Sequence, residues 1–230
     1  MESYMNRISN TGIVPVVKIL EKEDAYPLAK ALLNGGIDVI EVTYRSEHAT
    51  SAIQTISKEL PDMLVGAGTV LSVEQAKEAV QAGAKFIITP GFNTKVVQWC
   101  LNHDVEVYPG VSTASEVEMA LSMGLTQLKF FPAESSGGAK KLKDLSAPYA
   151  NVHFMPTGGI NTKNMHDYLS LPNVEAIGGS FMLPNDLVVA KDWNGIEALS
   201  RAAIKSLLDF QLIHVGINTN SPEESKQVTD

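Results

Sequence analysis

Cysteine and long apolar runs are both scarce in this sequence, and each absence excludes a class of protein. The single Cys100 allows no internal disulfide and cannot build a zinc site by itself, which favours a reducing cytoplasm. No uncharged apolar stretch approaches the roughly 18 residues that a membrane-spanning helix needs. The first residues include Glu2 and Arg7 and lack an apolar segment of signal-peptide length. We therefore expect a cytoplasmic protein that does not enter a membrane.

Charged side chains are also scarce, and the excess among them is acidic. They make up 19% of the 230 residues, against about 25% in an average soluble domain. The formal net charge is −8, without a cluster of Lys and Arg, so nucleic acid is excluded as a partner. The hydrophobic content of 44% excludes a disordered chain. The five histidines lack the spacing of metal ligands, so we expect no metal.

Eight short apolar runs alternate with segments of helical spacing. Each run has about the length of a typical strand and is rich in Val, Ile and Phe. Strands that alternate with helices are usually parallel and joined by right-handed crossovers. The predicted strands are residues 13–18, 37–44, 63–69, 85–89, 105–108, 126–131, 152–157 and 174–177.

Eight strand–helix units without a dividing linker favour a closed (β/α)8 TIM barrel over an open doubly wound sheet. The predicted fold class is therefore α/β, with a single barrel domain over residues 1–217. Residues 2–9 are expected to form a short helix before the first strand. The polar residues 218–230 are expected to form a disordered tail.

A lysine stands inside the sixth predicted strand, where lysine is rare unless it is paired. Strand alternation puts Leu128 and Phe130 on one face and Lys129 on the other. If the first face packs on the helices, Lys129 points into the barrel. Burial there disfavours the ammonium and favours a neutral amine that can attack a ketone. The alternative is a lysine that reaches solvent at a strand edge or pairs with a carboxylate.

A carboxylate and a guanidinium share one face at the end of the second predicted strand. Glu41 interrupts an apolar run and is a candidate for general acid/base catalysis. Arg45 offers a forked donor that suits a substrate carboxylate. The alternative is a structural ion pair between Glu41 and Arg45.

Two glycine pairs follow the last two predicted strands. Gly158–Gly159 and Gly178–Gly179 stand where barrels commonly bind phosphate, through backbone N–H groups and a helix N-terminus. Ser180 adds a hydroxyl donor beside the second pair. Two such pairs at adjacent strand ends favour a phosphate site over ordinary tight turns.

Seven motifs occur in order at the predicted strand ends between about residues 13 and 183. They are EVTYR (41–45), GAGTV (66–70), TPG (89–91), PGV (109–111), KFFPAE (129–134), PTGGI (156–160) and GGS (178–180). This set closely resembles the 2-keto-3-deoxy-6-phosphogluconate (KDPG) aldolases, a family that overlaps with the 4-hydroxy-2-oxoglutarate (KHG) aldolases.

The resemblance implies a class I aldolase on a (β/α)8 barrel, without metal or cofactor and usually a homotrimer. It implies cleavage of KDPG, a phosphorylated keto-deoxy sugar acid, to pyruvate and glyceraldehyde 3-phosphate. Lys129 would then be the Schiff-base lysine and Glu41 the general acid/base.

The same resemblance assigns the substrate contacts. Arg45 and Thr69 would hold the pyruvyl carboxylate, and Pro90 would line that pocket. Thr157 would contact the aldehyde-derived part of the substrate. The residues expected to bind phosphate are Gly158, Gly159, Gly179 and Ser180.

Three other activities stay open at this point. The first is an aldolase that acts mainly on 4-hydroxy-2-oxoglutarate or on the 6-phosphogalactonate epimer. The second is a phosphate-binding isomerase or epimerase, in which Glu41 abstracts a proton and Lys129 acts only through its charge. The third is a sugar-phosphate sensor without catalysis. The sequence also departs from many relatives at Lys18, where they have Arg or an apolar residue.

Overall fold

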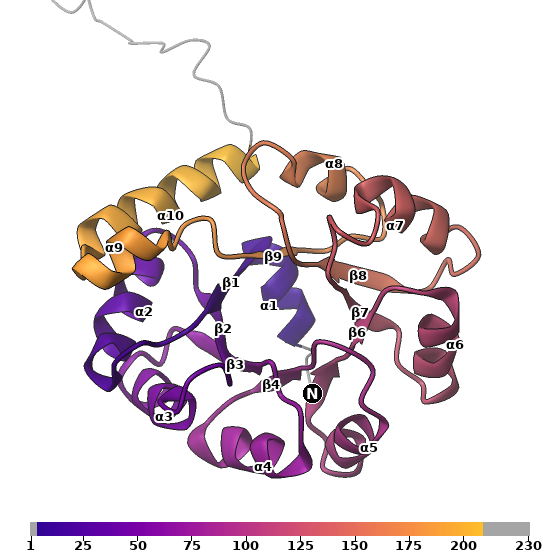
Figure 1. Cartoon of the computed structure of the whole chain (residues 1–230), viewed down its shortest axis with the longest axis horizontal. Coiled ribbons are helices and arrows are strands. Elements are labelled where there is room, and N and C mark those ends of the chain that lie inside the picture. Colours follow the sequence, from indigo (N-terminus) through magenta and orange to yellow (C-terminus); the bar gives the residue numbers. More distant parts are fainter. Residues whose placement is uncertain (1–3, 209–230) are drawn as a thin grey trace, which may run out of the picture.

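A ring of parallel strands forms the centre of the molecule, and helices surround it (Figure 1). The computed structural model describes residues 4–208. Its strands are β1 (Ile13–Val17), β2 (Val39–Thr43), β3 (Leu64–Gly68), β4 (Phe86–Ile88), β5 (Glu106–Tyr108), β6 (Gly110–Val111), β7 (Gln127–Phe130), β8 (His153–Pro156) and β9 (Ile177–Gly179).

The helices alternate with these strands along the chain. They are α1 (Tyr4–Thr11), the 3-10 turn η1 (Lys22–Asp24), α2 (Ala25–Asn34), α3 (Ala49–Glu59), α4 (Val73–Ala82), α5 (Thr94–Asn102), α6 (Ala114–Ser122), α7 (Gly138–Ser146), α8 (Met165–Leu169), α9 (Asn185–Ala190) and α10 (Trp193–Leu208).

Two parallel ladders close into a barrel. One has the order β5-β4-β3-β2-β1-β9, and the other has the order β6-β7-β8. Single bridges from Phe154 to Val174 and from Thr157 to Gly178 join β8 to β9. On the other side the chain passes directly from β5 into β6 through Pro109. This closure confirms the predicted α/β barrel.

The fifth predicted strand is split, and its second half continues past the predicted end. Pro109 has no N–H group and cannot donate to a ladder, so β5 pairs with β4 before it and β6 pairs with β7 after it. The proline therefore lies where the chain changes from one ladder to the other.

The eighth strand lies three residues later than predicted. Val174 makes only the single bridge to Phe154, whereas β9 pairs with β1 from Ile177 to Gly179. Glycines weaken a strand prediction, but Gly178 is required here by packing. A Cβ at Gly178 would come within 2.2 Å of the Thr157 hydroxyl oxygen.

Two hydrophobic layers fill the molecule. The larger lies between the strands and the helices, and the smaller lies inside the barrel. Met5 and Ile8 of α1 belong to the inner layer, together with inward residues such as Phe86. Figure 1 shows α1 across the middle of the ring. The predicted N-terminal helix is thus confirmed, with Tyr4 as its first residue in the structure.

The carboxyl end of the chain is described only to Leu208, the last residue of α10. The predicted tail, residues 218–230, lies outside the described residues, so the proposed domain boundary at 217 stays a prediction. No helix between residues 4 and 208 is long and apolar enough to cross a membrane.

Candidate active site

Lys129 lies inside the barrel, at the middle of β7. Leu128 and Phe130 belong to the outer hydrophobic layer, so the alternation of the strand turns Lys129 inward. Its neighbours in the ladders are Gly110 of β6 and Met155 of β8. Lys129 is 4% exposed, which excludes a lysine that reaches solvent at a strand edge.

Glu41 is the partner of this buried lysine. The Lys129 Nζ atom lies 3.1 Å from Glu41 Oε1 and 3.2 Å from Oε2. The Glu41 carboxylate is fully buried and passes directly over Gly68, where a Cβ would lie 2.0 Å from Oε1. The Phe131 ring is the other close neighbour, with its centroid 5.3 Å from Nζ. An amine and a proton acceptor therefore stand in contact in a dry setting.

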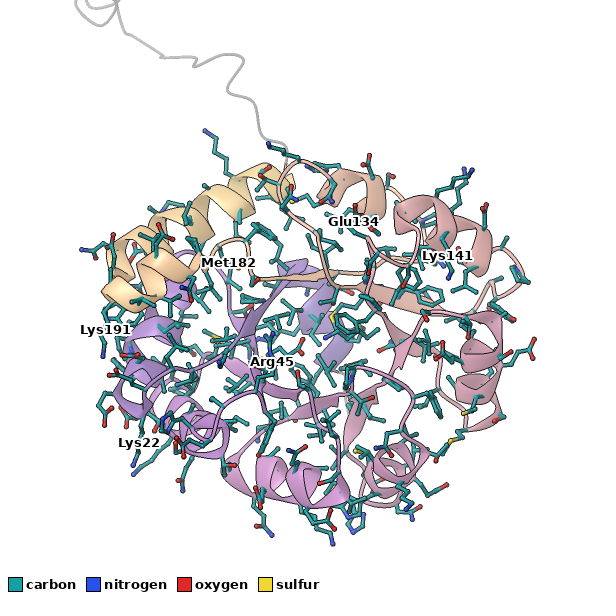
Figure 2. The ribbon with its side chains drawn as sticks, viewed as in Figure 1. Lys22, Arg45, Glu134, Lys141, Met182 and Lys191 are labelled. Carbon is teal, nitrogen blue, oxygen red and sulfur yellow. The ribbon has the colours of Figure 1, made fainter. Side chains whose placement is uncertain are left out.

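Arg45 does not pair with Glu41, so the alternative of a structural ion pair between them is wrong. The Arg45 Nε atom instead donates to the Thr43 hydroxyl at 3.1 Å. The side chain lies near the centre of the ring, whereas Lys22 and Lys191 lie on its outer side (Figure 2). Arg45, Lys18 and Ser180 line one cavity of about 200 Å³, which is therefore suited to an anion.

Thr69 and Pro90 follow directly on β3 and β4, at the same end of the barrel. Thr69 has a φ of 54°, an uncommon value for threonine that is enriched at functional sites. The Pro90 carbonyl lies against Gly110, where a Cβ would be 2.2 Å from its oxygen. The structure thus places both residues at the rim of the ring that surrounds Lys129.

The glycine residues of the predicted phosphate site lie around Thr157. Thr157 is buried, and its backbone carbonyl accepts from Ala133 N at 2.8 Å. Gly158 and Gly159 follow with φ values of +104° and +81°, which other residues rarely adopt. Gly178 and Gly179 are strand residues of β9, with Ser180 directly after them. The two glycine pairs are adjacent because the Thr157–Gly178 bridge joins them.

Several residues around the site were not identified from the sequence. Gly68 leaves the space that Glu41 occupies, and Thr43 holds Arg45. Glu134 lies against Gly159 and accepts a hydrogen bond from the hydroxyl of Tyr168. Alternation along β2 already places Thr43 on the face of Glu41, but no local pattern reveals the contacts of the others.

Cysteine chemistry and metal binding do not contribute to this site among residues 4–208. Cys100 is buried in α5, and burial raises the pKa of its thiol to about 12. No group of three His, Cys, Asp or Glu side chains within residues 4–208 could hold a metal ion. A cavity of about 420 Å³ lies at the opposite end of the barrel, lined by residues that include Tyr4, Glu106 and Gln127.

Comparisons with known proteins agree with this geometry. The 2-dehydro-3-deoxy-phosphogluconate aldolase of Treponema pallidum is 45% identical over 205 residues, which are 89% of this chain and 98% of the relative. The KHG/KDPG aldolase of Escherichia coli K12 is 44% identical over 199 residues, which are 86% of this chain and 93% of the relative.

A solved structure extends the similarity to three dimensions. The KDPG aldolase of Legionella pneumophila, with pyruvate captured as a covalent carbinolamine intermediate, has a TM-score of 0.85 and 40% identity. The match covers 88% of this chain and 98% of that one. The family model of KDPG and KHG aldolases matches residues 4–199. The chain therefore belongs to the KDPG and KHG aldolase family, whose members are carbon–carbon lyases.

Proposed function

We propose that this protein is a class I aldolase that cleaves KDPG to pyruvate and glyceraldehyde 3-phosphate through an imine on Lys129. The observation that carries the proposal is the buried contact of 3.1 Å between the Lys129 amine and the Glu41 carboxylate. A lysine can act as a nucleophile only without its extra proton, and Glu41 is placed to take that proton. Family membership supports the same chemistry.

The first half of the reaction builds the imine. The neutral Lys129 amine adds to the C2 carbonyl of the substrate, and the carbinolamine loses its hydroxyl group as water. Glu41 supplies the proton that makes this hydroxyl a leaving group. The product is a protonated imine, which draws electrons from the neighbouring C3–C4 bond.

The second half breaks that bond. Glu41, directly or through water, takes the proton of the C4 hydroxyl, and the electron pair of that O–H bond forms the second C–O bond of the carbonyl of glyceraldehyde 3-phosphate. The electron pair of the C3–C4 bond moves to the imine and leaves an enamine on Lys129. Protonation at C3 and addition of water then release pyruvate and restore the free amine.

The two ends of the substrate are anionic, and the site offers separate donors for them. We assign the pyruvyl carboxylate to Arg45 and Thr69, with Pro90 beside it, and the aldehyde-derived part to Thr157. The phosphate is assigned to the backbone N–H groups and hydroxyl of Gly158, Gly159, Gly179 and Ser180. The cavity that Arg45, Lys18 and Ser180 line supports the binding of an anion, since it holds two cations within a chain of net charge −8.

The same site is expected to cleave 4-hydroxy-2-oxoglutarate to pyruvate and glyoxylate, because the pyruvyl half is common to both substrates. We also propose a cytoplasmic homotrimer that needs no cofactor.

Trapping of the imine tests the proposal. The protein is incubated with pyruvate and borohydride, and the reduced adduct is located by peptide mass. We expect one adduct, on Lys129, and no adduct or cleavage activity in Lys129→Ala. Lys140→Ala, which removes an exposed lysine of α7, is the matched control and should keep both. Full activity in Lys129→Ala would overturn the proposal.

A further inference from the structure

Thr43 is a fully buried hydroxyl in the middle of the proposed site. It ends β2, on the inward face that also carries Glu41, and its exposed fraction is 0%. A buried hydroxyl is stable only with hydrogen-bond partners, so its partners indicate what it does. We propose that Thr43 is a positioning residue, which presents Arg45 to the carboxylate of the substrate.

The hydrogen bonds of Thr43 have a defined direction. The Thr43 hydroxyl donates to the backbone carbonyl of Val17 at 2.7 Å. A carbonyl can only accept, so the one hydroxyl proton is engaged there. The oxygen therefore accepts from the Arg45 Nε–H group at 3.1 Å. Both hydrogen bonds require a side-chain group at position 43 that donates and accepts at once. A hydroxyl does this, and the methyl group of a valine does not.

The contact with Thr43 determines which donors Arg45 has left. A guanidinium carries five N–H groups, of which the single Nε–H is occupied. Arg45 makes no ion pair with any of the described residues. The four N–H groups on Nη1 and Nη2 remain for a ligand, and their fork matches the two oxygens of a carboxylate.

The other end of this chain of hydrogen bonds is rigid. Val17 is the last residue of β1 and pairs with Val42 of β2 in the barrel ladder. Its carbonyl is therefore fixed by the sheet. Through its two hydrogen bonds, Thr43 links this fixed carbonyl to the long side chain of Arg45. Lys18 follows Val17 and lines the same cavity as Arg45. The end of β1 therefore positions both cations of this cavity, Lys18 through the chain and Arg45 through Thr43.

The inference rests on the carboxylate-binding role proposed for Arg45, and the experiment separates the two. Thr43→Val keeps the volume and removes the hydroxyl, so Arg45 loses its anchor. We expect the KM for KDPG to rise about 10-fold, the worth of roughly one hydrogen bond, while kcat changes less than about 3-fold. Thr43→Ser keeps the hydroxyl and should restore a KM within about 2-fold of the parent. If Thr43→Val does not fold, Thr43→Ala tests the same KM.

A double-mutant cycle then identifies the route of the effect. In an Arg45→Ala background the guanidinium is already gone, so we expect Thr43→Val to raise KM by less than about 2-fold. A full 10-fold rise in that background, or an unchanged KM in Thr43→Val alone, overturns the inference and leaves the aldolase intact. An unchanged KM in Arg45→Ala instead overturns the proposed role of Arg45.

Discussion

The Nζ atom of Lys129 lies 3.1 Å from the nearer carboxylate oxygen of Glu41, although the two residues are 88 positions apart in the chain. They belong to β7 and β2, which are not neighbours in either ladder, so the contact spans the interior of the barrel. Both side chains are nearly inaccessible to water, at 5% and 1% exposed. In the proposed reaction this pair supplies the nucleophile and the proton carrier, and each residue compensates the buried charge of the other.

Removal of one charge of the buried pair should lower the free energy of unfolding more than removal of both charges. Lys129→Met leaves Glu41 as an uncompensated buried charge, and we expect a loss of about 3–5 kcal/mol in the free energy of unfolding. Lys129→Met combined with Glu41→Gln should recover most of that loss, because no buried charge remains. Urea unfolding of the three proteins measures this. A double variant that is less stable than Lys129→Met would contradict the compensation between the two charges.

Gly68 should be essential for activity because Glu41 occupies the space of a Cβ there. In Gly68→Ala the added methyl group would lie 2.0 Å from Glu41 Oε1 and must displace the carboxylate from Lys129. We expect kcat to fall by about 100-fold, as for a catalytic group misplaced by about 1 Å.

The matched control for this substitution is Gly91→Ala, whose Cβ meets no atom within 4 Å. It adds the same methyl group near a strand end and should keep the melting temperature of the parent protein. An unchanged kcat in Gly68→Ala would show that the position of Glu41 is not critical.

Gly159 should determine affinity for the phosphorylated end of the substrate. Its φ of +81° strains any other residue, and a Cβ would lie 2.6 Å from Glu134 Cγ. We expect Gly159→Ala to raise the KM for KDPG about 10-fold and to leave the KM for 4-hydroxy-2-oxoglutarate within about 2-fold, since that substrate has no phosphate.

Gly124→Ala provides the comparison, since its φ of +78° is similar and its Cβ meets nothing within 4 Å. It introduces the same kind of backbone strain outside the proposed site, so both KM values should stay at those of the parent. Equal rises for the two substrates in Gly159→Ala would argue against a phosphate site at this loop.

The start of α6 should contribute a pH-dependent part of the stability. Glu116 and Thr113 form a capping box, in which Glu116 Oε2 accepts from Ser112 N at 2.8 Å and from Thr113 N at 2.9 Å. Partial burial acts to raise the pKa of Glu116, but these hydrogen bonds outweigh it, and the pKa is lowered from its usual value. A lowered pKa in the folded state gives stability that is present above the unfolded pKa and is lost as the pH falls through the folded pKa.

Glu116→Gln should therefore be less stable than the parent protein at pH 7, and the difference should shrink as the pH drops below about 4. Thr113→Ala, which removes the hydroxyl of the cap, should cost about 1 kcal/mol at pH 7. Urea unfolding at pH 7 and at pH 3 measures both. A difference between Glu116→Gln and the parent that grows toward acid would contradict the lowered pKa.

Local patterns were sufficient for most elements of the fold and for the choice of candidate residues at the strand ends. Apolar runs marked eight of the nine strands, because a buried parallel strand is largely apolar on both faces, and β6 lies just beyond the fifth run. Alternation in the sixth run put Lys129 opposite Leu128 and Phe130, and the structure confirms that it faces inward. Motifs in a fixed order identified the family before any contact was known, and the comparisons confirm it.

Tertiary structure decided the contacts that join distant segments. Alternation gave Glu41 and Arg45 one face but could not tell that Glu41 pairs with Lys129, since closure of the barrel brings β2 opposite β7. The need for glycine at position 68 and the start of β9 at Ile177 follow from contacts with Glu41 and with β1. A sequence specifies which side chain leaves which face of a strand, because that depends on neighbours in the chain. The partner it meets depends on how all the strands close around one interior.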